Sequence, residues 1–264
     1  GEIPDGGKVY SWARRNAAHE PLEGRFAPPS GFKRVAAPPG SYGAWLRRLP
    51  LLPAGSPVKS FRGQLIVEAG DARLAAVVDL DLSRRDRQQC ADTIMRLRGE
   101  YLHAVGKGDK ARFRWSGGMR FGYKQWRQGI RPVKEGKRWR GFKKSARACL
   151  GRRCLRRYLE FLFTWTGTMH LQQEPRVEPD EVQAGDFFVQ GGSPGHTVVI
   201  LDLSRGPGGE LRALMGQGFM PAQDLHVMRG PDGSPWFKLD PRAPGLKTPF
   251  WRTFSWEDLK RFAF

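Results

Sequence analysis

The stretch QQCADTIMRLRGEYL, residues 88–102, carries the clearest helical pattern of the sequence. Its apolar residues recur at the i, i+4, i+7 and i+11 spacing of one helix face, beginning at Cys90. We therefore predict an amphipathic helix within residues 83–105. Asp86 is its expected N-cap, with Gln89 as the capping-box partner. Cys90 would then lie in the first turn.

Cys90 is a candidate nucleophile because of this expected position. The first turn of a helix has unpaired N–H groups and the positive end of the helix dipole, and both lower the pKa of a thiol. The alternative is that Cys90 is a small buried apolar residue, since it lies on the apolar face.

Outward from this helix, the sequence alternates between strand-like and helical segments. Around Gly70-Asp71 we expect a hairpin, and after the helix a second helix that ends near Trp165. The C-terminal part is β-rich and ends in a short helix. The expected hairpin strands are 61–67 and 73–82, the later strands are 186–190, 196–203, 210–216 and 235–238, and the last helix is 255–262.

His196 begins the regular strand HTVVIL directly after the flexible segment GGSPG. An imidazole with a near-neutral pKa suits a base that must take and return a proton. Across a hairpin turned at 206–209, Gln217 could lie beside His196 and accept a hydrogen bond from its ring. The alternative for His196 alone is a histidine in a surface turn.

Two segments resemble the signature blocks of the CHAP and NlpC/P60 amidohydrolase-peptidases. They are QQCADTIMRLR, residues 88–98, and AGDFFVQGGSPGHTVVILDLSRGPGGELRALMGQGF, residues 184–219. The resemblance implies an α+β, papain-like fold in which the Cys90 helix packs on an antiparallel sheet. It also implies that Cys90 attacks a carbonyl, that His196 pairs with it and protonates the leaving amine, and that Gln217 orients His196.

Other residues would complete such a site. We expect the backbone N–H of Cys90, together with Gln89, to hold the oxyanion. Gln223 and His226 are further candidates, Gln223 as part of the cleft and His226 as an alternative orienter. The alternative for both is a packed loop.

The chain as a whole also resembles a bacterial family whose members are often secreted or lipid-anchored. The stretches GSYGAWLRRLPL, QQCADTIMRLRGEYL, GGSPGHTVVILD and MPAQDLHVM carry this resemblance. It implies a secreted, periplasmic or cell-envelope location, in which Cys149 and Cys154 could form a disulfide. We expect a Pro/Gly-rich extended leader over residues 1–30 and a single domain over 31–264.

The charge is concentrated in one segment. The chain has 45 Lys and Arg against 26 Asp and Glu, a formal net charge of +19. Residues 107–158, here the basic insertion, hold 19 of the basic residues and two acidic ones, so nearly all of the excess lies there. The insertion is also rich in aromatic residues. Its expected substrate-binding residues are Trp115, Arg120, Tyr123, Trp126 and Arg127.

The basic insertion has three interpretations. It could be a solvated basic surface, a wall that guides an anionic polymer such as peptidoglycan into the cleft, or a nucleic-acid-binding surface. Nucleic acid is not favoured, because no helix-turn-helix, RRM or zinc-finger motif is present.

Together these patterns predict a cysteine-dependent amidase or peptidase acting on peptidoglycan-type peptide or amide bonds. The alternative is a catalytically inert module of the same fold that binds an anionic polymer through the basic insertion. No spacing suggests a metal site, we expect no cofactor, and no apolar run reaches the ~20 residues that span a bilayer.

Overall fold

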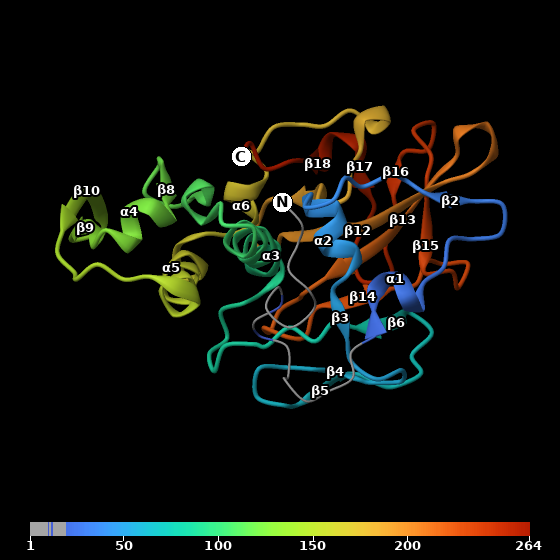
Figure 1. The fold of residues 1–264 in the computed structure, drawn as a ribbon, viewed down its shortest axis with the longest axis horizontal. Coiled ribbons are helices and arrows are strands. Elements are labelled where there is room, and N and C mark those ends of the chain that lie inside the picture. Colours follow the sequence, from blue (N-terminus) through green and yellow to red (C-terminus); the bar gives the residue numbers. More distant parts are fainter. Residues whose placement is uncertain (1–9, 11, 13–19) are drawn as a thin grey trace.

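Alternating apolar residues in the C-terminal half build one large antiparallel sheet in an α+β fold (Figure 1). The structure is a computed structural model that describes Tyr10, Trp12 and residues 20–264. Within these residues the sheet has eight strands, in the order β18-β11-β12-β13-β14-β6, with β15 on β13 and β2 on β12. Their bounds are β2 Lys33–Arg34, β6 Leu74–Val77, β11 Phe187–Gln190, β12 His196–Arg205, β13 Leu211–Gln217, β14 His226–Met228, β15 Trp236–Leu239 and β18 Leu259–Lys260.

The central strand β12 is buried on both faces, which explains its nearly continuous apolar sequence. Side chains alternate between the faces of a strand. Val199 and Leu201 therefore belong to the core beneath the helices, whereas Val198 and Ile200 belong to a second core on the opposite face. The sheet thus separates two apolar layers.

Helix α3, Cys90–Ala104, covers the first of these faces and packs against β12, and a second long helix, α5, Gly151–Trp165, packs on the outer side of α3 (Figure 1). Helix α3 begins at Cys90, with Gln89 as N-cap, whose N–H donates to the carboxylate of Asp92 at 3.0 Å. The predicted N-cap Asp86 is wrong, because its carboxylate instead accepts the Ala222 N–H at 2.7 Å and fixes a distant loop.

Shorter elements surround this framework. The helices are α1 Leu22–Arg25, α2 Tyr42–Arg47, α4 Tyr123–Arg127 and α6 Thr168–Leu171, and the 3-10 turns are Gly108–Lys110, Pro179–Glu181, Pro207–Gly209 and Trp256–Asp258. The remaining strands are β1 Glu20–Pro21, β3 Pro50–Leu51, β4 Val58–Lys59, β5 Leu65–Val67, β7 Arg112–Arg114, β8 Arg120–Gly122, β9 Ile130–Glu135, β10 Arg138–Lys144, β16 Gly245–Leu246 and β17 Phe254–Ser255.

Two sequence expectations fail where pairing across the fold overrides local pattern, and a third falls only partly within the described residues. The predicted 61–67/73–82 hairpin does not form, because β5 pairs with β4 and β6 joins β14 in the large sheet. The predicted helix at 255–262 is one 3-10 turn followed by β18, which extends the sheet beside β11. The predicted leader 1–30 falls largely outside the described residues, but Leu22 and Phe26 are buried, so its end belongs to the domain.

The basic insertion forms a lobe built from α4, β7–β10 and the start of α5, and most of it extends away from the sheet (Figure 1). Its aromatic side chains pack together and against α5 rather than facing solvent. A disulfide joins Cys149, just before α5, to Cys154 in the first turns of that helix.

Candidate functional site

The thiol of Cys90 lies at the first position of α3, where the helix begins against β12. Its side chain is 9 % exposed. The backbone N–H groups of Cys90, Ala91 and Thr197 are directed at the sulfur. Two of these come from the helix start and the third from β12, so the thiol sits where helix and sheet meet.

The resting thiol is protonated. Burial, followed by the charge of Asp92, raises the pKa of Cys90 to about 12, although the three N–H groups act in the opposite direction. The N–H groups of the helix start thus lower this pKa as expected, but the expected net lowering is wrong for this conformation. Desolvation of the sulfur outweighs the N–H groups because the site is closed in on most sides.

Cys90 borders a cleft of about 470 Å³. One wall is the start of α3 with Asp86, Arg87 and Gln89, and another is the segment from Phe163 into α6. The third wall is the Gly192–Gly195 turn that precedes His196, and Met220 also lines the cleft. A cleft beside the thiol is what a substrate would need in order to reach the sulfur.

Two close contacts hold these walls together, and both occur at glycines. A Cβ at Gly195 would lie 2.2 Å from Oγ1 of Thr168 in α6. A Cβ at Gly218 would lie 2.6 Å from Oγ1 of Thr93 in α3. The glycines thus allow α6, the turn and the end of β13 to approach the thiol, a role that their positions in the sequence do not reveal.

His196 presents its ring to the other face of the sheet. It shares its face with Val198 and Ile200 by strand alternation, and its ring centroid lies 4.5 Å from that of Phe219 and 5.2 Å from that of Trp251. The side chain is buried, with 1 % exposed. Burial lowers the pKa of His196 to about 4, so the ring is neutral at pH 7.

A row of hydrogen bonds connects His196 to Gln217 and His226. His196 Nε2 lies 2.7 Å from Gln217 Oε1, and Gln217 Nε2 lies 3.1 Å from His226 Nε2. Nδ1 of His226 lies 3.1 Å from the carbonyl oxygen of Asp224. Sequence spacing predicted the neighbourhood of Gln217 and His196, and this row also includes His226.

The row fixes the tautomer of each ring. A carbonyl only accepts, so His226 carries its proton on Nδ1 and donates to Asp224. Burial lowers the pKa of His226 to about 4, so its Nε2 is bare and accepts from the Gln217 amide. The amide oxygen then accepts from Nε2–H of His196. Nδ1 of His196 is left with a lone pair, which is the form a general base requires.

Thr197 is the connection between the thiol and the imidazole. Its N–H is directed at the sulfur of Cys90, and the preceding residue is His196. Among the described residues, no hydrogen bond joins the sulfur to the ring itself. The resting thiol and imidazole are therefore both neutral and lie on opposite faces of the sheet, so they do not form the expected ion pair.

The other expected cleft residues have different environments. Gln89 borders the cleft, and its amide donates to Asp86 at 3.0 Å. Gln223 is buried and bridges to Ser60 through the backbone, away from the residues that line the cleft.

The expected substrate-binding residues of the basic insertion do not form a binding surface. Trp115, Tyr123 and Trp126 are buried, because the lobe needs an apolar core of its own. Arg120 forms a two-pronged ion pair with Glu174, and Arg127 pairs with Asp109. The expectation that Trp115 and Tyr123 stack on a bound polymer is therefore wrong, whereas the edge of Trp126 reaches the wall of a separate pocket.

The part of the chain that the structure describes contains neither a metal-binding cluster nor a membrane-spanning helix. No group of three or more His, Cys, Asp or Glu side chains there could hold a metal ion. Of the helices in that part, none combines the length and the apolar character needed to cross a bilayer.

The model of one protein family, described as "Domain of unknown function (4846)", matches residues 22–261. This range covers most of the chain and includes both α3 and the His196 row. The search of curated proteins and that of solved structures gave no match.

Proposed function

We propose that this chain, which belongs to the family described as "Domain of unknown function (4846)", is a cysteine-dependent amidase or peptidase with a papain-like arrangement. The observation that carries the proposal is the position of Cys90 at the start of α3, beside a cleft and next to Thr197. A substrate carbonyl in this cleft would meet the sulfur and the N–H groups at the helix start together.

The proposed reaction uses the lone pair that the hydrogen-bond row leaves on His196. The thiol proton passes to Nδ1 of His196 as the sulfur attacks the carbonyl carbon. The imidazolium then returns that proton to the leaving amine, and water hydrolyses the resulting thioester. Gln217 would orient the ring, and His226 would in turn fix the amide of Gln217.

The resting pKa values set a condition on this reaction. A thiol with a pKa of about 12 does not give its proton to a base with a pKa of about 4 at pH 7 in the resting site. The ring also lies on the other face of the sheet from the sulfur, so the proposed transfer requires the start of β12 to rearrange until ring and sulfur come within hydrogen-bond distance. The proton then moves during attack. A substrate that fills the cleft and contacts the Gly192–Gly195 turn would be able to shift His196, because His196 directly follows that turn.

We propose peptide or amide bonds of the peptidoglycan type as the substrate class. The net charge of +19 supports an anionic polymer, and Arg87 lines the cleft itself. A secreted or envelope location is proposed with it. The disulfide between Cys149 and Cys154 supports that location, because such bonds persist in oxidising compartments.

The test compares the purified chain with Cys90→Ala and His196→Ala on peptidoglycan fragments and on simple peptide amides. We expect release of new amino groups by the wild type and a loss of at least ~10³-fold in both variants, with unchanged circular dichroism. A wild type that is inert on all substrates, or a Cys90→Ala variant that retains the activity, would refute the proposal. Binding of the polymer that survives both substitutions without any cleavage would instead indicate a binding module.

A further inference from the structure

A second pocket lies on the other side of Arg87, between the segment that leads into α3 and the outer face of α5. Its volume is about 580 Å³. Five arginines and one glutamate contribute to its walls, together with two aromatic rings. The lining residues are Leu82, Ser83, Arg84, Arg87, Trp126, Arg153, Arg156, Arg157, Glu160 and Phe161. We call this the arginine pocket.

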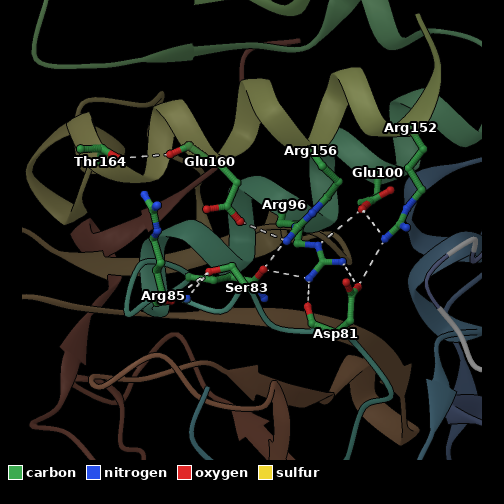
Figure 2. Close-up of polar contacts among 10 residues, drawn as sticks. Asp81, Ser83, Arg85, Arg96, Glu100, Arg152, Arg156, Glu160 and Thr164 are labelled. Carbon is green, nitrogen blue, oxygen red and sulfur yellow. Dashed lines mark hydrogen bonds and ion pairs between the residues drawn. The ribbon is translucent and has the colours of Figure 1, made fainter. Parts of the chain in front are cut away.

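The arginines of this pocket differ from those beneath it. Arg96 is fully buried and pairs with Asp81 and with Glu100, while Arg152 reaches the same two acids from α5 (Figure 2). The deeper charges are thus balanced before the pocket is reached.

In the arginine pocket itself, positive side chains outnumber negative ones by five to one. Arg156 is half-buried and pairs with Glu160 at 3.2 Å, which uses the single acid of the lining (Figure 2). Burial, followed by the nearby Arg96, lowers the pKa of Arg156 to about 10, although Asp81, Glu100 and Glu160 act in the opposite direction. Among the described residues, no side-chain acid pairs with Arg84, Arg87, Arg153 or Arg157.

Four guanidinium groups without an acidic partner line one concave surface, and because three of them are exposed they remain solvated while their summed positive potential attracts an anion. One carboxylate is satisfied by one two-pronged arginine. A phosphate group has about two charges and several acceptor oxygens, so it can engage several guanidinium groups at once. The number and convergence of the arginines therefore favour phosphate over carboxylate.

Arg87 lines both the arginine pocket and the cleft of Cys90. Helix α5 also contributes to both, with Glu160 and Phe161 in the pocket and Phe163 and Thr164 in the cleft. A ligand with a phosphate in the arginine pocket could extend past Arg87 to the thiol. We propose that the arginine pocket is a phosphate subsite, which binds a phosphate group of the molecule whose amide bond Cys90 cleaves. This part of the assignment rests on the proposed function.

The experiment measures binding of inorganic pyrophosphate to the full chain by calorimetry at low salt. The pocket variant is Arg153→Gln/Arg157→Gln, both on the exposed face of α5. The matched control is Arg112→Gln/Arg138→Gln, which removes the same charge from exposed strand positions of the basic insertion outside the pocket. We expect at least a tenfold weaker Kd for the pocket variant and a change of less than about twofold for the control.

Binding measurements with other anions identify the chemical class of the ligand. Inorganic phosphate, pyrophosphate and a short polyphosphate distinguish a single phosphate site from one that needs linked phosphates, and citrate tests carboxylate. We expect pyrophosphate to bind more tightly than phosphate, citrate to bind at least tenfold more weakly than pyrophosphate, and affinity to fall with salt. Equal losses in the two double variants, citrate binding as tight as pyrophosphate, or no binding would each overturn the subsite.

The two proposals fail separately. Cys90→Ala should bind pyrophosphate as the wild type does, because the thiol does not line the arginine pocket. Pyrophosphate binding without any amide cleavage would support the phosphate subsite and refute the amidase proposal. Amide cleavage without pyrophosphate binding would support the amidase proposal and refute the subsite.

Discussion

On one side of the sheet, in the layer of α3 and α5, a cluster of buried polar groups around Arg96 is charged and paired. Arg96 is fully buried and contacts Asp81, Glu100 and Gln88. On the other side, the buried groups are neutral and joined in a row, from His196 through Gln217 to His226. Both arrangements keep polar atoms away from water, but only the first does so with full charges.

The difference follows from the chemistry of the residues. A guanidinium group stays protonated, so a buried arginine must be given an opposite charge. An imidazole can instead lose its proton, and burial of His196 and His226 lowers their pKa to about 4. The neutral row therefore retains a lone pair that can act as a base, which a paired arginine never offers.

The largest expected effect is on the charged side. Arg96→Met leaves Glu100 buried without its partner on the same helix, and we expect the free energy of unfolding to fall by about 3–5 kcal/mol. Guanidinium chloride titration measures the change.

Arg152→Met is the matched control, because Arg152 reaches the same two acids with a partly exposed side chain. We expect it to lose about 1 kcal/mol or less. Equal losses in Arg96→Met and Arg152→Met would show that burial of the pair does not govern its contribution.

The next effect concerns the thiol, which lies where the two sides meet. Raising the pKa of Cys90 from 9.0 to about 12 lowers its thiolate fraction at pH 8 by about a thousandfold. Alkylation by iodoacetamide should therefore be correspondingly slow at pH 8 and rise about tenfold per pH unit above it. Mass spectrometry of the modified Cys90 peptide gives the rate.

A rate plateau in the acid range would contradict this expectation. It would mean that the resting enzyme already holds the thiolate as an ion pair with His196, and the same profile recorded on His196→Ala would show whether the ring is responsible.

The stability contributed by the neutral row of His196, Gln217 and His226 should depend on pH. Both histidines have a folded-state pKa of about 4 against a usual value of 6.5, so between these pH values the unfolded chain binds more protons. Their contribution to stability is complete above about pH 6.5 and is lost as the pH falls towards 4. We expect a loss of a few kcal/mol, measured as the difference in denaturant midpoint between pH 7 and 4.5.

The variant His226→Gln isolates this effect from the titration of carboxylates, since it removes one titrating ring of the row. Its stability should fall less steeply over the same pH range than that of the wild type. Parallel pH profiles for the two proteins would show that burial of His226 does not set its protonation.

Local patterns in the sequence located much of this arrangement. The 3.6-residue period identified α3 and placed Cys90 near its start, and alternation identified β11, β12 and β13 within a residue or two. Counting across the β12–β13 hairpin brought Gln217 beside His196, because antiparallel register depends mainly on the length of the turn.

Pairing between distant segments could not be read in the same way. The strand β6 has the alternation of a hairpin strand, yet it pairs with β14, more than a hundred residues later. The aromatic residues of the basic insertion looked accessible because cations flank them, but the lobe folds around them and leaves the cations outside.

By itself the sequence determined which residues could do chemistry and which elements carry them, since helix and strand periods are local properties. It did not determine protonation or access. Burial sets the pKa of Cys90 and of His196, and burial results from the packing of α3, α5 and the 192–195 turn around them. The same packing leaves the unpaired arginines of α5 facing one pocket, because only the tertiary structure decides which cations have acids within reach.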